Sequence, residues 1–138
     1  SSPQVTMRPA NPNGILISED IVLDPAKLLK IFNEERISNG VSPITQNTAM
    51  CEISNYRVNQ MIKLGRLETP DELEQIQYPT GYSDAKSLVG MYFLSEENVF
   101  RAFKEEDERS QRRMFKGGEF TWGCVSVESH AVAFVVGY

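Results

Sequence analysis

Few residues in this sequence combine the type and spacing that catalysis or metal binding requires. The densest group of ionisable side chains is the stretch EEDERSQRRMF, Glu105–Phe115, which holds seven charged residues. It is compatible with an active-site rim, a binding patch or a solvated helix face. Pairs at i,i+4 spacing, Glu105 with Arg109 and Glu108 with Arg112, would each stabilise a helix by about 0.2–0.5 kcal/mol. A solvated helical face therefore explains the composition of this stretch.

The other reactive side chains form no recognisable catalytic group. His130 is the only histidine, and it falls in a predicted tight turn, where a turn role is favoured over a catalytic one. A Ser-His-Asp triad would have to use this residue, and a zinc site would need further donors that the pattern does not gather. Cys51 and Cys124 are too far apart for a CxxC motif, so either a disulfide or two buried thiols remain.

Composition limits the classes of protein that remain possible. The chain of 138 residues fits one domain, predicted over residues 15–138 and preceded by an irregular arm, residues 1–14. No apolar run approaches the roughly 20 residues of a membrane-spanning helix. A net charge of -5 disfavours a nucleic-acid partner, which usually selects a basic surface. The first residues lack a basic start and an apolar stretch, so we expect a mature or trimmed N-terminus.

Four helices are expected from capping residues and apolar spacing. They are predicted over residues 25–40, 48–64, 70–76 and 96–116, the last ending at Gly117-Gly118. Asp24 and Pro25 open the first, and Ser95 caps the last. A capping box, Thr69-Pro-Asp-Glu72, opens the short third helix. The Pro- and Gly-containing loop QYPTGYS then follows as a candidate flexible wall.

Three strands complete the expected elements, over residues 85–94, 119–128 and 131–138. The last two are apolar on both faces and are joined by a tight turn. A sheet of that kind must be covered on both sides, here by helices. The predicted fold is therefore α/β, a three-layer α-β-α sandwich with a mainly antiparallel central sheet.

The serial order of these segments resembles the CAP superfamily, which contains cysteine-rich secretory proteins, antigen 5 and pathogenesis-related 1 proteins. An apolar pair, Leu28-Leu29, is followed by Asn33-x-x-Arg36, a Gly and the turn Pro43-Ile44. Later, ENVFRAFKEE stands where the family has a helix with a Trp, and WGCVSV resembles its Gly-Cys-small strand. The resemblance spans residues 22–138 and implies the same α-β-α sandwich.

The family's metal-competent cleft uses two His and two Glu, and this chain departs from that set. By order of segments the four positions fall near Glu68, Tyr82, Glu106 and Gln111 or Arg112, and only Glu106 keeps its type. Replacing imidazoles with Glu, Gln or Arg removes the donors that suit zinc. The resemblance therefore predicts neither a metal nor a cofactor.

The family's other cysteines are also missing here. The resemblance consequently implies that Cys124 pairs with Cys51, an arrangement that is not standard for the family. A bridge between them would close a loop of about 70 residues.

The functional reading follows from the resemblance. It implies a secreted, non-catalytic binding or interaction module that carries a sterol or another lipid, or recognises a protein partner. Candidate contacts are Tyr78 and Tyr82 in the QYPTGYS loop, with Glu68, Glu106 and Arg112 in the cleft. One alternative is a hydrolase that uses Glu106 as a base, with Glu68 across the cleft. Another is a structural or antigenic surface protein without a ligand.

Overall fold

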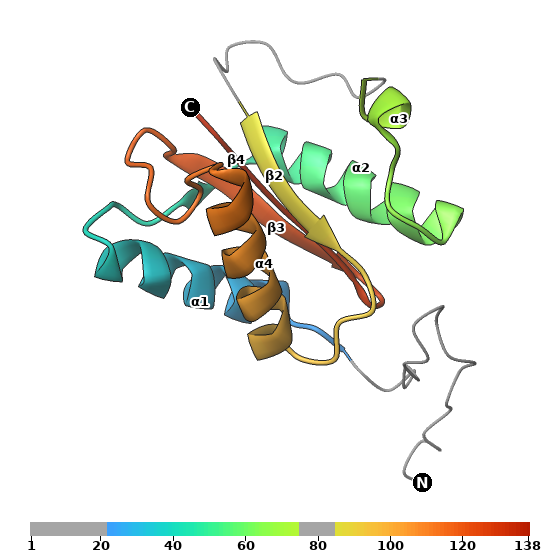
Figure 1. Cartoon of the computed structure of the whole chain (residues 1–138), viewed down its shortest axis with the longest axis horizontal. Coiled ribbons are helices and arrows are strands. Elements are labelled where there is room, and N and C mark those ends of the chain that lie inside the picture. The colour runs from blue at the N-terminus through green and yellow to red at the C-terminus, as the bar shows by residue number, and fades with distance from the viewer. Residues whose placement is uncertain (1–21, 75–84) are drawn as a thin grey trace, which may run out of the picture.

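The described residues form four helices and four strands. The computed structural model describes residues 22–74 and 85–138 (Figure 1). The predicted arm, residues 1–14, and the loop that carries Tyr78 and Tyr82 lie outside these ranges. The elements are α1 (Pro25–Ser38), β1 (Thr45–Gln46), α2 (Thr48–Leu64), α3 (Pro70–Glu74), β2 (Ala85–Gly90), α4 (Glu96–Ser110), β3 (Trp122–Glu128) and β4 (Ala131–Gly137).

The helix starts follow from local capping chemistry. The Asp24 side chain accepts the N–H of Ala26 at 3.0 Å, and Ser95 Oγ accepts the N–H of Asn98 at 3.1 Å. At the start of α3, Thr69 and Glu72 exchange side-chain to backbone hydrogen bonds of 3.2 and 2.9 Å. Each cap occupies backbone N–H groups that lack a partner within the helix. The predicted starts of these three helices are confirmed.

The central sheet has four strands in the order β1-β3-β4-β2. β4 pairs antiparallel with β3 and with β2, whereas β1 pairs parallel with β3. The sheet is therefore mixed, and the expectation of a mainly antiparallel sheet is wrong. Its parallel strand is only two residues long, held where Thr45 N–H donates to Thr121 O at 3.0 Å. So short a strand leaves no alternating pattern in the sequence.

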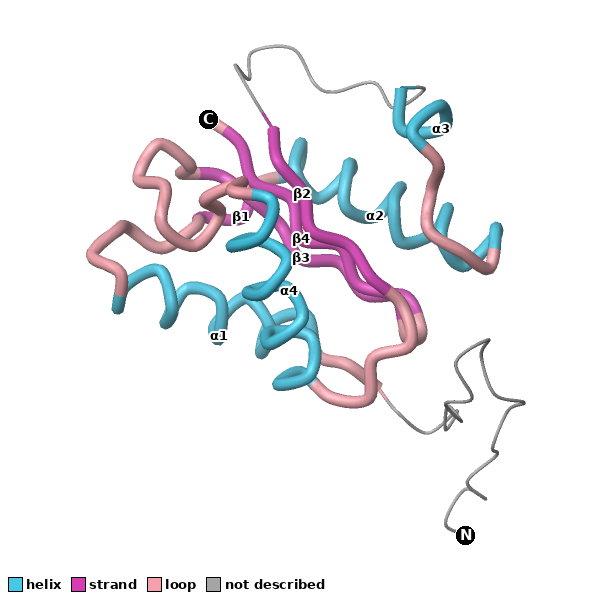
Figure 2. Tube along the Cα trace, viewed as in Figure 1, coloured by secondary structure: helices cyan, strands magenta, loops and turns pink. Residues whose placement is uncertain are grey.

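Helices cover both faces of this sheet (Figures 1 and 2). On one face, α1 and α4 enclose an apolar cluster that includes Phe32 and Phe103 of the helices with Val125 and Phe134 of the strands. On the other face, α2 packs on alternate strand residues such as Val135. Every residue of β4 is buried, as a central strand covered on both sides requires. No helix among the described residues is long and apolar enough to span a bilayer.

α4 ends earlier than the sequence predicts. The helix stops at Ser110, and Gln111 has left-handed backbone angles with φ 57°. The carboxylate of Asp107 then accepts the backbone N–H groups of Met114 and Phe115 at 3.0 and 3.3 Å. This buried carboxylate holds the following residues in a folded-back loop. The helix predicted to continue to residue 116 is therefore corrected to an end at Ser110.

Arg36 fixes the same loop from α1. Its guanidinium is fully buried and donates to the carbonyl oxygens of Ser42, Met114, Gly117 and Phe120 at 2.5–3.1 Å. Burial lowers the pKa of Arg36 from its ordinary value, and the charges of Glu119 and Asp107 oppose that shift. This residue therefore pins the connection between α4 and β3 to α1.

A disulfide joins α2 to the sheet. Cys51 and Cys124 are bonded, with their Cα atoms 4.9 Å apart. The sulfurs lie in the apolar layer between α2 and the strands, against Met50, Ile53 and Val135. The sequence left open whether these cysteines form a disulfide or remain as two buried thiols, and the structure contains the disulfide.

Candidate functional site

A cavity of about 390 Å³ lies against β2 and α4 and the segment that connects α2 to α3. Its volume is at the lower end of the range for small-molecule sites, which is about 300–1,000 Å³. Its lining comprises Arg57, Leu67, Glu68, Leu73, Ser87, Leu88, Val89, Phe93, Ala102, Phe103, Glu106, Arg109 and Arg112. We call this cavity the β2–α4 pocket.

The apolar part of the pocket comes from the core of the domain. Leu88 on β2 and Phe103 on α4 are 1% and 2% exposed, and Phe93 packs its ring on Phe103 edge to face at 5.6 Å. These side chains are held by the same cluster that joins α1 and α4 to the sheet. The apolar wall is therefore preformed rather than dependent on a ligand.

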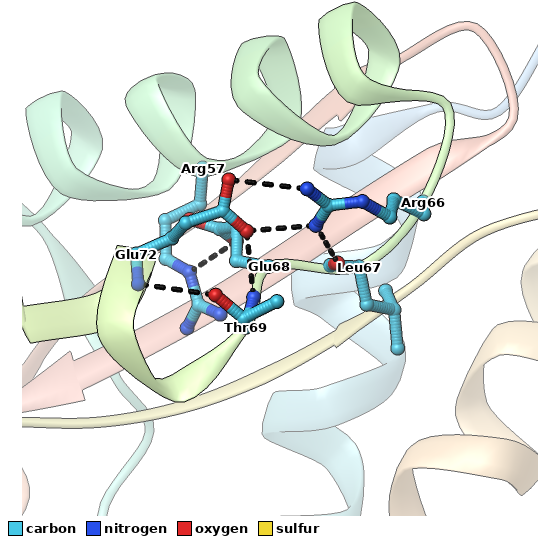
Figure 3. A network of polar contacts seen from close by, with 6 residues as sticks. All are labelled: Arg57, Arg66, Leu67, Glu68, Thr69 and Glu72. Carbon is cyan, nitrogen blue, oxygen red and sulfur yellow. Dashed lines mark hydrogen bonds and ion pairs between the residues drawn. The ribbon is translucent and has the colours of Figure 1, made fainter.

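A buried ion pair forms part of the polar lining. Arg57 Nε donates to Glu68 Oε1 at 3.0 Å, and the two side chains are 5% and 0% exposed. Arg57 Nη1 also donates to Ser87 Oγ on β2. Figure 3 shows Arg57 reaching from α2 toward Glu68 on the connecting segment. The guanidinium thus ties α2, β2 and this segment together at the pocket.

Glu68 has one oxygen without a hydrogen-bond donor. Its Oε2 is buried, and no described group donates to it. Buried polar atoms in native proteins nearly always have a partner, and an unpaired one costs about 1–3 kcal/mol. A residue that lines the pocket therefore carries a buried acceptor that the described residues leave unsatisfied.

The segment that carries Glu68 is fixed at both of its ends. Arg66 and Glu72 form an ion pair with a shortest distance of 2.7 Å, and Glu72 also accepts the N–H of Thr69 (Figure 3). The Arg66 hydrogen bond, supported by the backbone bond from Thr69, lowers the pKa of Glu72 to about 2. These contacts fix the chain directly before and after Glu68.

Charged side chains of α4 and the loop after it complete the lining. Glu106 Oε2 pairs with Arg109, and Glu106 Oε1 accepts from Arg112 Nη1 at 3.2 Å. The hydrogen bond from Arg109, with that from Arg112, lowers the pKa of Glu106 against the opposing effect of desolvation. The predicted pairs Glu105 with Arg109 and Glu108 with Arg112 are wrong, because both arginines turn to Glu106. Arg112 lies beyond the end of α4, so helical i,i+4 spacing does not apply to it.

The structure brings some of the predicted site residues together. Glu68 lines the same pocket as Glu106 and Arg112, which lie about forty residues further along the chain. Gln111 instead lines a different hollow of about 310 Å³ beside Asp107. Tyr78 and Tyr82 lie outside the described residues, so their contacts stay predictions.

Sequence reasoning missed three polar residues of the pocket, Arg57, Ser87 and Arg109, the last of which it placed only in a solvated helix face. Arg57 follows Ser54 by three residues and precedes Met61 by four, so helical spacing places it on the buried face of α2. An arginine at an apolar-face position was the available signal. Ser87 sits in a strand of small and apolar residues and carried no comparable signal.

His130 occupies the turn between β3 and β4, as predicted, and is largely buried there. Its Nδ1 accepts the backbone N–H of Tyr92 at 3.0 Å, and the two rings stack at 4.4 Å. Tyr92 has a φ of 65°, an uncommon backbone angle for a bulky residue. His130 therefore supports the loop between β2 and α4.

The lining of the β2–α4 pocket does not suit a divalent metal ion. Glu68 Oε1 and both oxygens of Glu106 already accept from guanidinium groups, and three arginines line the pocket. Their positive charges repel a cation. No cluster of three or more potential ligands occurs in the described part of the chain. We therefore derive no chemistry through a metal.

No family model matches the sequence, and no curated protein sequence matches it. Solved structures do match the fold. A cysteine-rich secretory protein from Staphylococcus aureus subsp. aureus Mu50 superposes with TM-score 0.61 at 16% identity, over 81% of this chain and 37% of that chain. An extracellular protein containing an SCP domain from Bacillus anthracis str. Ames gives TM-score 0.63 at 12% identity, over 81% and 39%. The chain therefore spans under two fifths of either structure.

Proposed function

We propose that this chain, which has a CAP-like fold, is a secreted, non-catalytic binding domain that holds a small amphipathic ligand in the β2–α4 pocket. The observation that carries this proposal is the composition of the pocket. A preformed apolar wall meets a set of convergent polar groups, of which Arg57 and Glu68 are buried, an arrangement compatible with a ligand site. The apolar wall would hold the tail of the ligand and the polar groups its head.

Secretion is supported by the disulfide between Cys51 and Cys124, since such bonds persist mainly in oxidising compartments. The structural neighbours are described as a cysteine-rich secretory protein and an extracellular protein. Both observations favour an extracellular location for this chain.

A non-catalytic role is supported by the state of the pocket carboxylates. An efficient general base has a pKa near the working pH. The arginine contacts of Glu106 move its pKa in the opposite direction, and Glu68 is fixed by Arg57. The hydrolase alternative, with Glu106 as base, is therefore the less favoured reading.

The polar lining also bears on the kind of ligand. A sterol offers one hydroxyl and a large apolar body, which would cover the arginines of the pocket without replacing their hydration. A smaller molecule with a polar head and a short apolar tail suits the volume and the lining better. Carriage of a larger lipid and recognition of a protein partner remain predictions of the sequence alone.

The test uses three molecules that share one branched tail and differ in their head group: isohexanol, isocaproate and isohexylamine. Each is titrated into the protein while amide chemical shifts are followed by NMR. We expect at least one to give saturating shifts at Ser87, Val89 and Ala102, which line the pocket. Shifts scattered over the surface, or no saturation by any of the three, would overturn the proposal.

A pocket-filling variant supplies the control. Ala102→Trp places a large side chain on the α4 wall and should abolish the saturating shifts. Glu105→Trp introduces the same side chain at an exposed position of the same helix and should leave them unchanged. Equal binding by the two variants would place the ligand elsewhere.

A further inference from the structure

We propose that the head group of the ligand is a carboxylate with an adjacent N–H, as in an N-acylated amino acid or the C-terminal residue of a peptide. This inference rests on the proposed function and specifies the chemistry of the same pocket. Three observations carry it: the charge of the lining, the open guanidinium positions, and the unsatisfied oxygen of Glu68.

The lining has an excess of positive charge. Three arginines, Arg57, Arg109 and Arg112, stand against two carboxylates, Glu68 and Glu106, which leaves one positive charge in excess. The whole chain carries a net charge of -5, so the pocket differs in sign from the protein around it. Clefts with low-dielectric walls focus such a field and concentrate ligands of the opposite charge. An anionic head group is therefore favoured.

Arg57 offers a donor that the described residues do not use. Its Nε donates to Glu68 and its Nη1 to Ser87, whereas Nη2 makes no hydrogen bond to any described residue. The side chain is 5% exposed, so its orientation is fixed by its surroundings. A guanidinium presents its donors in a rigid planar fork that matches a carboxylate. A carboxylate at this nitrogen would complete the bonding of a buried cation.

Arg112 offers a second donor on the side of α4. Its Nη1 reaches Glu106 and Ser110, and the side chain is 34% exposed. Its Nη2 has no hydrogen-bond partner among the described residues. Because it is partly open to solvent, this guanidinium can receive a ligand without first breaking a buried contact.

The unsatisfied oxygen of Glu68 specifies the group beside the carboxylate. Glu68 lines the pocket, and its Oε2, which is closed to solvent, accepts no hydrogen bond from the described residues. A ligand that carries an N–H one or two atoms from its carboxylate would bring a donor toward Glu68 while its carboxylate faces an arginine. An α-amino acid with an acylated nitrogen has this arrangement, and its side chain supplies the apolar tail.

The decisive comparison is between N-acetyl-leucine and N-acetyl-leucinamide, which differ only in the head group, an anionic carboxylate against a neutral carboxamide. Binding is followed by the amide shifts of the pocket residues. We expect the acid to bind at least about tenfold more tightly than the amide, because hydrogen bonds to charged partners are the stronger ones. Leucinamide, which carries a positive charge, should not saturate. Equal affinity of acid and amide would overturn the inference.

Isocaproate tests the contribution of the N–H, since it is the same acid without the acetamido group. We expect it to bind more weakly than N-acetyl-leucine by about fivefold, the effect of one modest hydrogen bond. Equal or tighter binding of isocaproate would overturn the part of the inference that involves Glu68.

A short acetylated peptide ending in leucine separates the two possible sources of the head group, a peptide C-terminus and a free acylated amino acid. Tighter binding than N-acetyl-leucine indicates a peptide C-terminus, and equal binding indicates a free acylated amino acid.

Variants test the residues themselves. Arg112→Gln, at a partly exposed site, should weaken N-acetyl-leucine about tenfold and leave N-acetyl-leucinamide unchanged. Arg101→Gln, an exposed position of α4 outside the pocket lining, is the matched control. The double variant Arg57→Met/Glu68→Leu removes the buried pair together, which avoids a lone buried charge, and should abolish the preference for the acid.

The inference and the proposed function fail in different ways. If isohexanol binds in the pocket as tightly as isocaproate, or if Arg112→Gln and the double variant leave the preference for the acid intact, the inference is wrong and the proposed function stands. If none of these molecules reaches the pocket, both are wrong.

Discussion

Arg57 Nε donates to Glu68 Oε1 across 3.0 Å, and both side chains are almost completely removed from solvent. The pair connects α2 to the segment that leads into α3, and it stands in the wall of the β2–α4 pocket. Taking two charges out of water is costly, and their attraction offsets that cost only while both are present. The structure of the pocket therefore depends on the pair as a unit.

Removing one partner of this pair should be far more harmful than removing both. Arg57→Met leaves the Glu68 charge buried and should lower the free energy of unfolding by about 3–5 kcal/mol. Arg57→Met/Glu68→Leu should recover most of that loss. Urea unfolding followed by circular dichroism measures the free energy of unfolding of both variants. Lys27→Ala, which breaks a surface pair with Glu96, is the control and should cost under about 1 kcal/mol. A double variant no more stable than Arg57→Met would contradict this account.

Arg36 should be equally hard to replace, for a different reason. Its guanidinium serves four carbonyl oxygens, and Arg36→Met would leave them without this donor. At about 1–3 kcal/mol for each unsatisfied group, we expect a loss of at least about 4 kcal/mol. Arg36→Lys should recover only part of this lost stability, because an ammonium group cannot reach the same four acceptors. Urea unfolding measures the loss, with exposed Arg101→Met as the control. Wild-type stability of Arg36→Lys would refute the argument.

The elements that the sequence predicts well are those with local causes. The caps at Asp24, Thr69 and Ser95 act within three residues, and they mark the starts of their helices in the sequence itself. The apolar pattern on both faces of the last two strands predicts helices on both sides, as the structure has them. Order of segments was enough to indicate a CAP-like fold.

The elements that it does not predict depend on distant partners. The end of α4 is set by Asp107, which accepts from the loop, and by Arg36, which lies more than seventy residues away in the sequence. Locally, the charged stretch after residue 105 favours a longer helix. Arg57 stands at an apolar-face position of α2, but local spacing does not predict its partners, Glu68 and Ser87. At the pocket, contacts between residues distant in sequence therefore determine the structure more than local helix preference does.

The disulfide should make a large contribution to stability. Cys51 and Cys124 are 73 residues apart, and on the chain-entropy model a loop of that length is worth about 4 kcal/mol. We expect reductant to lower the melting temperature of the wild type, measured by circular dichroism. Cys51→Ala/Cys124→Ala should melt near the reduced wild type and should not respond to reductant. Two free thiols in the unreduced, unfolded protein would contradict the bridge.

Acid should weaken the contact that fixes the segment carrying Glu68. The Arg66 hydrogen bond lowers the pKa of Glu72 from its ordinary value of 4.5 to about 2. Between these values the unfolded chain binds the proton more readily than the folded one, so this contribution to stability is complete above about pH 4.5 and is lost as the pH falls through 2. An NMR titration of the Glu72 carboxyl should have its midpoint near 2. Arg66→Gln should raise that midpoint toward the ordinary value, whereas Arg101→Gln should not. An unchanged midpoint in Arg66→Gln would show that the ion pair is not the cause.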